Sequence, residues 1–365
     1  MILTVNKNIT NVKNCNSQNF KGENDNYAIP ISSYNVDKFI KDVDKSVELQ
    51  KKGNIFTRYI WSTTALIPAA MLVLPYEFHN LYKLNKLKKA GEIELLKVGK
   101  QSFRKTFPWL CSGAVALYAG LEYLFSRNFD KKYEKYKQDF ERINTSTDAK
   151  LADYTVNANV MGAMCSPISG NVVINRNILR DPISSRRAIK LLKHELVHAK
   201  QYETIARSEN GIKKLNYAVM KSSSRSVDTP QGRNEVTLIY SDIINDKSGK
   251  YDNLNLSVLG AEVNLKNYIT ALYVLLNDEK CGIDDIPMVI DEKHYQNVVD
   301  KKGKLSQQEE IKAEQYYQAQ LSYPLATPLK MLNPFSDYYD NLLEKEAYKE
   351  SPNFMTFIRK ICGKN

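Results

Sequence analysis

The segment His194-Glu195-Leu196-Val197-His198 constrains this chain more than any other stretch of its sequence. It holds two of the four histidines in 365 residues, placed four positions apart with a glutamate beside the first. In a helix, residues four positions apart lie on the same face, so both imidazoles can bind one metal ion. The adjacent carboxylate then reaches the water on that metal, as in the H-E-x-x-H zinc motif. We therefore expect a helix here, with His194 and His198 as zinc ligands and Glu195 as general base.

Charge and cysteine content exclude several other classes of protein. The net charge of +11 comes from 52 Lys and Arg interleaved with 41 Asp and Glu, without an arginine-rich tract. We therefore expect no nucleic-acid partner, and we interpret the net positive charge as that of a protein lying beside an anionic lipid surface. The five cysteines are scattered and never form C-x-x-C, which argues against a disulfide framework and favours a reducing compartment. Residues 1–36 lack a signal-peptide pattern and are expected to be a disordered tail.

Two apolar stretches predict a membrane hairpin within residues 37–145. The run 59–76 has no charged residue, the run 107–125 has a single acidic one, and both carry aromatic residues at their ends. A membrane helix needs about 17–25 apolar residues, so we expect helices over about 57–78 and 106–126. The loop between them carries eight Lys or Arg, and the two outer flanks carry six each, or twelve together. Because basic residues collect on the cytoplasmic side, this slight excess favours a cytoplasmic location for both ends. The alternative is a buried helical hairpin of a soluble domain.

The remaining chain predicts a mainly helical α+β domain over residues 146–365, with a small sheet. The charged segment Asp130–Arg142 before it is expected to be a solvated linker helix. The β-branched run Val172–Asn175 predicts a strand, and Asp181-Pro182 predicts the start of a helix that carries the motif to about Ala206. A strand at the edge of the sheet can hold an extended peptide above such a helix. Further helices are expected at Leu215–Lys221, Glu235–Ile244, Val258–Leu276, Ser306–Leu321 and Asp337–Lys349.

A catalytic zinc ion needs a third protein ligand, which the motif helix does not supply. Gln201 and Thr204 occupy the places of the glycine and of the third histidine in the extended motif H-E-x-x-H-x-x-G-x-x-H. The other histidines, His79 and His294, are expected at the surface. A downstream glutamate is therefore the natural candidate.

Near the C-terminus, Glu344-Lys345-Glu346-Ala347 has the form E-x-x-A. Together with His194-Glu195-x-x-His198-Ala199, it resembles the pattern of the gluzincin metallopeptidases, in which the Glu of E-x-x-A-D on a later helix completes the zinc site. The hydrophobic hairpin before the domain is similar to that of the membrane-bound CAAX-protease/HtpX branch. The resemblance rests on these two short motifs and the hairpin. It implies a zincin-like metallopeptidase domain with Glu344 as the third zinc ligand.

The chain departs from that family pattern at Tyr348. The family has an Asp at this place, which orients a zinc-bound histidine. Asp340, one helical turn before Glu344, is the alternative source of such a carboxylate. The strongly charged helix around Glu310 is expected to expose this glutamate to solvent. Four other glutamates remain open as third ligands, namely Glu262, Glu310, Glu314 and Glu346.

These features predict a multi-pass membrane protein whose cytoplasmic domain is a zinc endopeptidase acting on a protein or peptide substrate. Glu195 is expected to take a proton from the zinc-bound water and to pass it to the leaving amine. Tyr202, Tyr338 and Tyr339 are the candidates for stabilising the tetrahedral oxyanion. The alternative, which the departure at Tyr348 keeps open, is a catalytically inactive membrane-associated scaffold with a retained zinc site.

Overall fold

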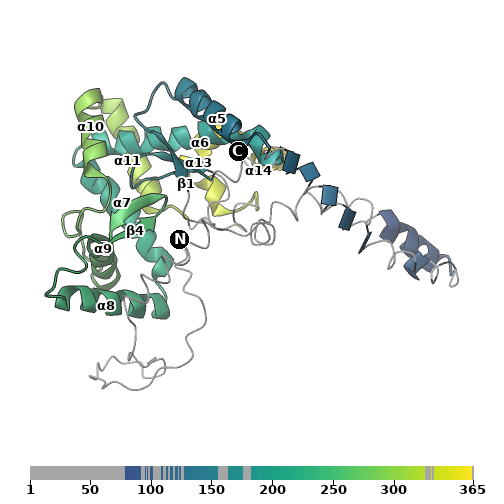
Figure 1. Ribbon diagram of the computed structural model, residues 1–365, viewed down its shortest axis with the longest axis horizontal. Coiled ribbons are helices and arrows are strands. Elements are labelled where there is room, and N and C mark those ends of the chain that lie inside the picture. Colours follow the sequence, from purple (N-terminus) through teal and green to yellow (C-terminus); the bar gives the residue numbers. More distant parts are fainter. Residues whose placement is uncertain are drawn as a thin grey trace, which may run out of the picture.

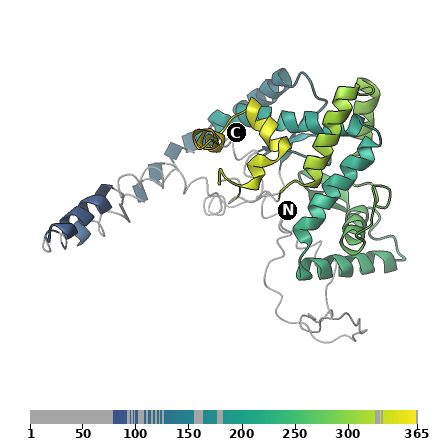
Figure 2. The same ribbon diagram turned by 180° about the vertical axis from the view of Figure 1, so that it is seen from behind.

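The computed structural model confirms a mostly helical chain with a small sheet. Figure 1 shows the strands beside a group of packed helices, and Figure 2 shows the same group from behind. The predicted tail 1–36 lies outside the described residues. The structure describes short helical pieces between 95 and 124 and the ranges 79–91, 127–154, 163–175, 182–324, 330 and 333–363.

The helix α6, Pro182–Arg207, carries the H-E-x-x-H motif and matches the helix predicted from Asp181-Pro182 to about Ala206. Ala188, Leu192 and Ile205 are each 0% exposed along it. Because its apolar residues recur at helical spacing, α6 packs against several other helices. Its helical neighbours are α5 (Phe129–Ile143), α7 (Gly211–Val227), α10 (Glu292–Lys302), α11 (Gln307–Leu321) and α13 (Leu342–Glu350).

The sheet beside α6 has the strand order β1-β3-β2. β1 (Leu151–Tyr154) runs parallel to β3 (Val172–Asn175), whereas β2 (Ala163–Cys165) pairs with β3 in the antiparallel direction. Residues 172–174 are at most 1% exposed, so the predicted strand is covered on both faces. The strand predicted at 172–175 is therefore central. The edge strand that lies against α6 is β2, which the sequence did not predict.

A β-hairpin replaces the first part of the helix predicted over Val258–Leu276. β4 (Asn255–Val258) and β5 (Ala261–Asn264) pair on either side of Leu259-Gly260. These turn residues have φ of 48° and 73°, as a tight two-residue hairpin turn requires, and glycine adopts that conformation freely. The helix that follows, α9 (Leu265–Asn277), packs against α7 and against α8, which spans Pro230–Asn245.

The C-terminal helical prediction needs a similar correction. The predicted helix Asp337–Lys349 is divided into a 3-10 helix, Asp337–Asp340, and α13. Asn341 separates them because its side chain caps α13. A further helix, α14 (Phe354–Ile361), was not predicted.

The charged segment before the sheet is a helix, α5, but it is not fully solvated. Tyr133 and Phe140, seven positions apart on one face, are each 2% exposed, and α5 packs against α6. The charged residues occupy the remaining faces. The prediction of a solvated linker is therefore wrong for this face, because two aromatic side chains are enough to dock an otherwise charged helix.

The predicted membrane hairpin is not tested by the described residues. None of the helices that the structure describes is long and apolar enough to cross a membrane. The predicted helix 57–78 lies outside the described residues, and only short helical pieces of the one over 106–126 are described. In those pieces, Trp109 is 81% exposed and Tyr123 is 71% exposed. The hairpin therefore remains a prediction from the sequence.

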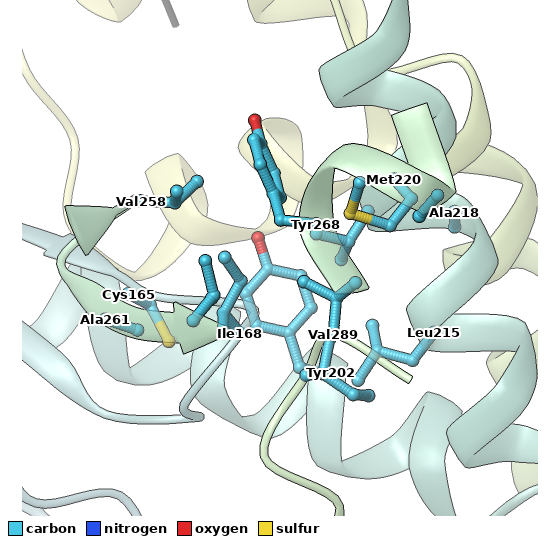
Figure 3. Packing of buried hydrophobic residues seen from close by; sticks show 14 of the residues in the cluster. Cys165, Ile168, Tyr202, Leu215, Ala218, Met220, Val258, Ala261, Tyr268 and Val289 are labelled. Atoms are coloured by element: carbon cyan, nitrogen blue, oxygen red, sulfur yellow. The ribbon is translucent and has the colours of Figure 1, made fainter. Parts of the chain in front are cut away.

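The apolar core lies directly behind the motif helix. Figure 3 shows Tyr202 of α6 among buried residues that include Leu215 of α7, Ile168 and Val289. Burial of a large apolar side chain contributes about 1.5–3 kcal/mol, so this cluster fixes α6 firmly against its neighbours. The Tyr202 ring stacks on the His198 ring with centroids 6.4 Å apart, which connects the core to the motif.

Candidate metal centre

Three side chains from two distant parts of the chain converge at the middle of α6. His194 and His198 lie one helical turn apart, each 5% exposed, with their Nε2 atoms 3.2 Å apart. Glu344 of α13 is 1% exposed, and its oxygens lie 3.3 Å from His194 Nε2 and 3.4 Å from His198 Nε2. In the part of the chain that the structure describes, these residues form the one group of His, Cys, Asp or Glu side chains that could hold a metal ion.

The spacing of these ligand atoms suits a metal ion. Tetrahedral zinc bound at about 2.0–2.1 Å holds neighbouring ligand atoms about 3.3–3.4 Å apart. The observed separations of 3.2, 3.3 and 3.4 Å match that value. In addition, Oε2 of Glu344 is buried and accepts no hydrogen bond from the described residues. A buried carboxylate oxygen without a donor is costly, and a cation between the three side chains removes that cost.

Glu344 lies in the first turn of α13, whose position is fixed by the capping residue Asn341 through two side-chain hydrogen bonds. The side-chain oxygen of Asn341 accepts a hydrogen bond from Leu343 N at 2.9 Å, and its amide nitrogen donates to Ala319 O at 2.9 Å. Ala347 is 0% exposed, and its small side chain allows α13 to lie close to α6. Since residues three apart share a helix face, the E-x-x-A spacing directs Glu344 and Ala347 to the same contact.

The ionisation of the group follows from burial and from the opposite charges. Burial alone would lower the pKa of His198, but the Glu344 carboxylate outweighs it and raises the pKa to about 9. Burial also opposes ionisation of Glu344, yet the two histidines hold the pKa of that carboxyl well below its usual range. At neutral pH in the metal-free protein, His198 therefore carries a proton, and its positive charge balances Glu344 as a metal cation would.

Glu195 lies on α6 beside the first histidine and is 6% exposed. Its Oε2 accepts a hydrogen bond from Cys165 N, the last residue of β2, at 2.7 Å. Burial raises the pKa of Glu195; the two histidines and the Cys165 amide lower it, and Glu344 raises it, with a net upward shift. A buried carboxylate with a raised pKa, held by one oxygen, is suited to accept a proton on the other.

The two histidines have different surroundings. His198 Nδ1 lies 2.9 Å from Gln201 Oε1, whereas His194 Nδ1 has no hydrogen-bond partner among the described residues. The ring of Tyr348 lies against His194 instead, with centroids 4.3 Å apart. Asp340 does not replace the missing carboxylate, because it forms an ion pair with Arg359. The alternative in which Asp340 supplies this carboxylate is therefore wrong.

Glu344 has a hydrogen-bond partner that the sequence did not indicate. The hydroxyl of Tyr323, just beyond the end of α11, donates a hydrogen bond to Oε1 of Glu344. Tyr323 is one of 23 tyrosines and belongs to no recognisable motif. Only the three-dimensional arrangement identifies it.

The rival glutamates lie outside the group. Glu262 of β5 is exposed, and Glu314 of α11 pairs with Lys214 at 3.1 Å. Glu310 is half-buried on α11 but does not join the histidines. Its helix is not a solvated face throughout, because Tyr316 and other α11 residues are buried. Glu346 lies beside the group and accepts a hydrogen bond from the Tyr316 hydroxyl at 2.5 Å.

The two remaining histidines are also separate from the group. His79 is exposed, as predicted. His294 is not the surface residue that was predicted but a half-buried residue in the first turn of α10. Its ring packs against Gly170, whose φ of +69° and missing Cβ leave room for it. The sequence prediction failed because it overlooked α10.

The tyrosines proposed as oxyanion donors are buried around the group. Tyr202 packs into the core shown in Figure 3. Tyr338 and Tyr339 contact the ring of Tyr348, with centroids 6.5 and 5.2 Å away. Tyr338, Tyr339 and Tyr348 therefore form an aromatic wall on the His194 side of the group, whereas Tyr202 stacks on His198. This geometry favours none of the three candidates as the oxyanion donor.

Comparisons with known proteins give no family assignment to set beside this geometry. No family model matches the chain, and neither a curated protein nor a solved structure matches it.

Proposed function

We propose that this protein is a zinc-dependent endopeptidase of the zincin type. The observation that carries the proposal is the buried convergence of His194, His198 and Glu344, with Glu195 on the same helix turn. A zinc ion on these three ligands supplies Lewis acidity and lowers the pKa of a water molecule to near neutrality. The reaction is hydrolysis of a peptide bond.

Glu195 acts as the general base and then as the general acid. Its Oε2 is held by the Cys165 amide, so the carboxylate cannot rotate freely when its other oxygen takes a proton from the attacking water. The same proton then passes to the nitrogen of the leaving amine. In the metal-free arrangement burial raises the pKa of Glu195, which marks this carboxylate as a proton acceptor in a buried site.

The substrate binds along the outer edge of β2. Ser166 N bonds to Asn171 O on the β3 side, while Cys165 N points the other way, towards Glu195. Because successive residues of a strand alternate, the main chain of Ala163 faces the same side as that of Cys165. An extended peptide added at this edge runs beside α6, with its main chain near the catalytic glutamate.

The test is Glu195→Gln in the full chain. This variant keeps the shape and the hydrogen bond to Cys165 but cannot accept a proton, so it should bind zinc like the wild type and lose casein digestion at least about 100-fold. Glu310→Gln, a change of the same kind outside the group, is the control and should remain active. A fully active Glu195→Gln enzyme overturns the proposal.

The second candidate is a catalytically inactive zinc-binding scaffold on the membrane. The observation that favours it is the aromatic ring of Tyr348 against His194, where a carboxylate would increase the basicity of the ligand. Both candidates bind zinc, so metal content does not separate them. Digestion of casein or of a labelled membrane protein, abolished by a chelator and restored by zinc, decides for the peptidase.

A further inference from the structure

Gln201 is the only buried amide side chain in contact with the metal centre among the described residues, and it faces two directions at once. It lies one turn after His198 on α6 and is 1% exposed. Its Oε1 lies 2.9 Å from His198 Nδ1. Its Nε2 donates to Leu343 O at 3.1 Å and to Glu346 Oε2 at 3.4 Å, both on α13.

These contacts determine the orientation of the amide. Leu343 O and the Glu346 carboxylate only accept hydrogen bonds, so the NH₂ end of Gln201 must face α13. The carbonyl end must then face His198, whose Nδ1 has to carry a proton to donate. With Nδ1 protonated, a neutral His198 has the lone pair of Nε2 on the side of Glu344 and His194. This is the tautomer that binds a metal ion placed between the three side chains.

Glu346 is held in turn from a third helix. Its Oε2 accepts a hydrogen bond from the Tyr316 hydroxyl of α11 at 2.5 Å, and Lys312 Nζ lies 3.4 Å from its Oε1. A chain of hydrogen bonds therefore runs from His198 through Gln201 and Glu346 to Tyr316, across α6, α13 and α11. Among the described residues, Nδ1 of His194 has no hydrogen-bond partner that could start such a chain.

We infer that Gln201 is a positioning residue for the metal centre, which fixes the tautomer of His198 and fastens Glu344's helix to the histidine helix. In a carboxylate–histidine–metal arrangement, a carboxylate bonds directly to the histidine. Here the Gln201 amide lies between them, so Glu346 polarises His198 through one intervening side chain. Leu343 directly precedes Glu344, so the bond to its carbonyl also sets the position of the third ligand. The inference rests on the proposed metal centre and extends it.

The experiment measures zinc affinity of the full chain by competition with a chromophoric chelator. Gln201→Met has a similar length but no polar group, and it should weaken zinc binding by about 10–100-fold. Asn216→Leu is the matched control, because Asn216 of α7 is also a buried amide, 1% exposed, and its bonds go to Pro287 O and Val289 N, outside the metal centre. It should lower the melting temperature and leave the zinc affinity of the folded protein unchanged.

A second variant separates positioning from general stability. Gln201→Glu/Glu346→Gln exchanges the amide and the carboxylate, so His198 still donates to an acceptor and the two side chains can still bond to each other. The bond to Leu343 O is lost, because a carboxylate has no proton to donate. Its zinc affinity should therefore lie below that of the wild type and above that of Gln201→Met, and within about 10-fold of the wild type where Gln201→Met fails to fold. Zinc binding by Gln201→Met equal to the wild type, or affinities that simply follow the melting temperatures of all variants, overturns the inference.

The same data distinguish this inference from the proposed function. Wild-type protein that binds no zinc overturns the metal centre and with it the role of Gln201. Wild-type protein that binds zinc with the expected dependence on Gln201, but digests no substrate, overturns the peptidase and supports the positioning role.

Discussion

His198 and Glu344 stabilise each other in opposite charge states when no metal is present. The pKa of His198 is raised from 6.5 to about 9, so its contribution to stability is complete below pH 6.5 and is lost as the pH rises towards 9. The pKa of Glu344 is lowered, so its contribution is present above about pH 4.5 and is lost on acidification. The metal-free protein should therefore be most stable between about pH 5 and 6.5.

Thermal unfolding in a chelator tests this dependence. Between pH 6.5 and 9, the free energy of unfolding should fall by up to about 3 kcal/mol from the His198 contribution. Zinc should reverse the trend, because it replaces the proton on His198, and the zinc-induced rise in melting temperature should grow with pH. A metal-free protein that becomes more stable from pH 6.5 to 9 contradicts the mutual stabilisation of these two residues.

The helix α13 transmits its position directly to the third ligand. Ala347 is 0% exposed at the contact with α6, three residues after Glu344. Ala347→Leu adds three carbon atoms there, and overpacking of this kind typically costs about 1–3 kcal/mol. Because α13 has only nine residues, we expect it to shift as a unit, and zinc affinity should fall together with stability.

Lys345→Leu is the control for that prediction, since Lys345 is exposed on the same helix. It should change neither zinc affinity nor melting temperature by more than a small amount, because surface substitutions are usually within about 0.5 kcal/mol. Zinc binding by Ala347→Leu as tight as in the wild type would show that the close packing of α13 is not needed to position Glu344.

The elements show why some of the structure was predictable and some was not. The motif helix has strong start and periodicity signals, so its bounds agree with the prediction. The convergence of Glu344 on the two histidines also agrees, because the E-x-x-A motif singled this residue out. The hairpin at Leu259-Gly260 was mistaken for a helix, because apolar residues in a short run fit both periodicities. The edge strand β2 has only three residues, too few for a periodic pattern, although it holds Glu195. Gln201 was noted only as a departure from a longer motif, because its role depends on residues 142 positions away.

The whole chain combines a buried centre with two apolar runs, 59–76 and 107–125, that precede it in the sequence. The run 59–76 has no charged residue, and the exposed Trp109 and Tyr123 come from helical pieces of the second run. Because such surfaces are unfavourable in water, we predict that the full chain inserts in a membrane and resists extraction by alkaline carbonate. This prediction rests on the sequence, independently of the metal centre.

Two arginines in the first run provide the test. Ile67→Arg, at the centre of the predicted helix 57–78, should cost about 2.5–3.5 kcal/mol for insertion, and Val73→Arg adds a smaller cost nearer the helix end. Together they should prevent a segment of this length from spanning the bilayer. The variant should lose the first span and become partly extractable. Asn85→Arg/Gln101→Arg adds the same charge to the already basic loop and should stay in the membrane fraction. A wild-type chain that alkaline carbonate releases completely would exclude the membrane hairpin and favour the alternative in which both apolar runs are buried within soluble protein.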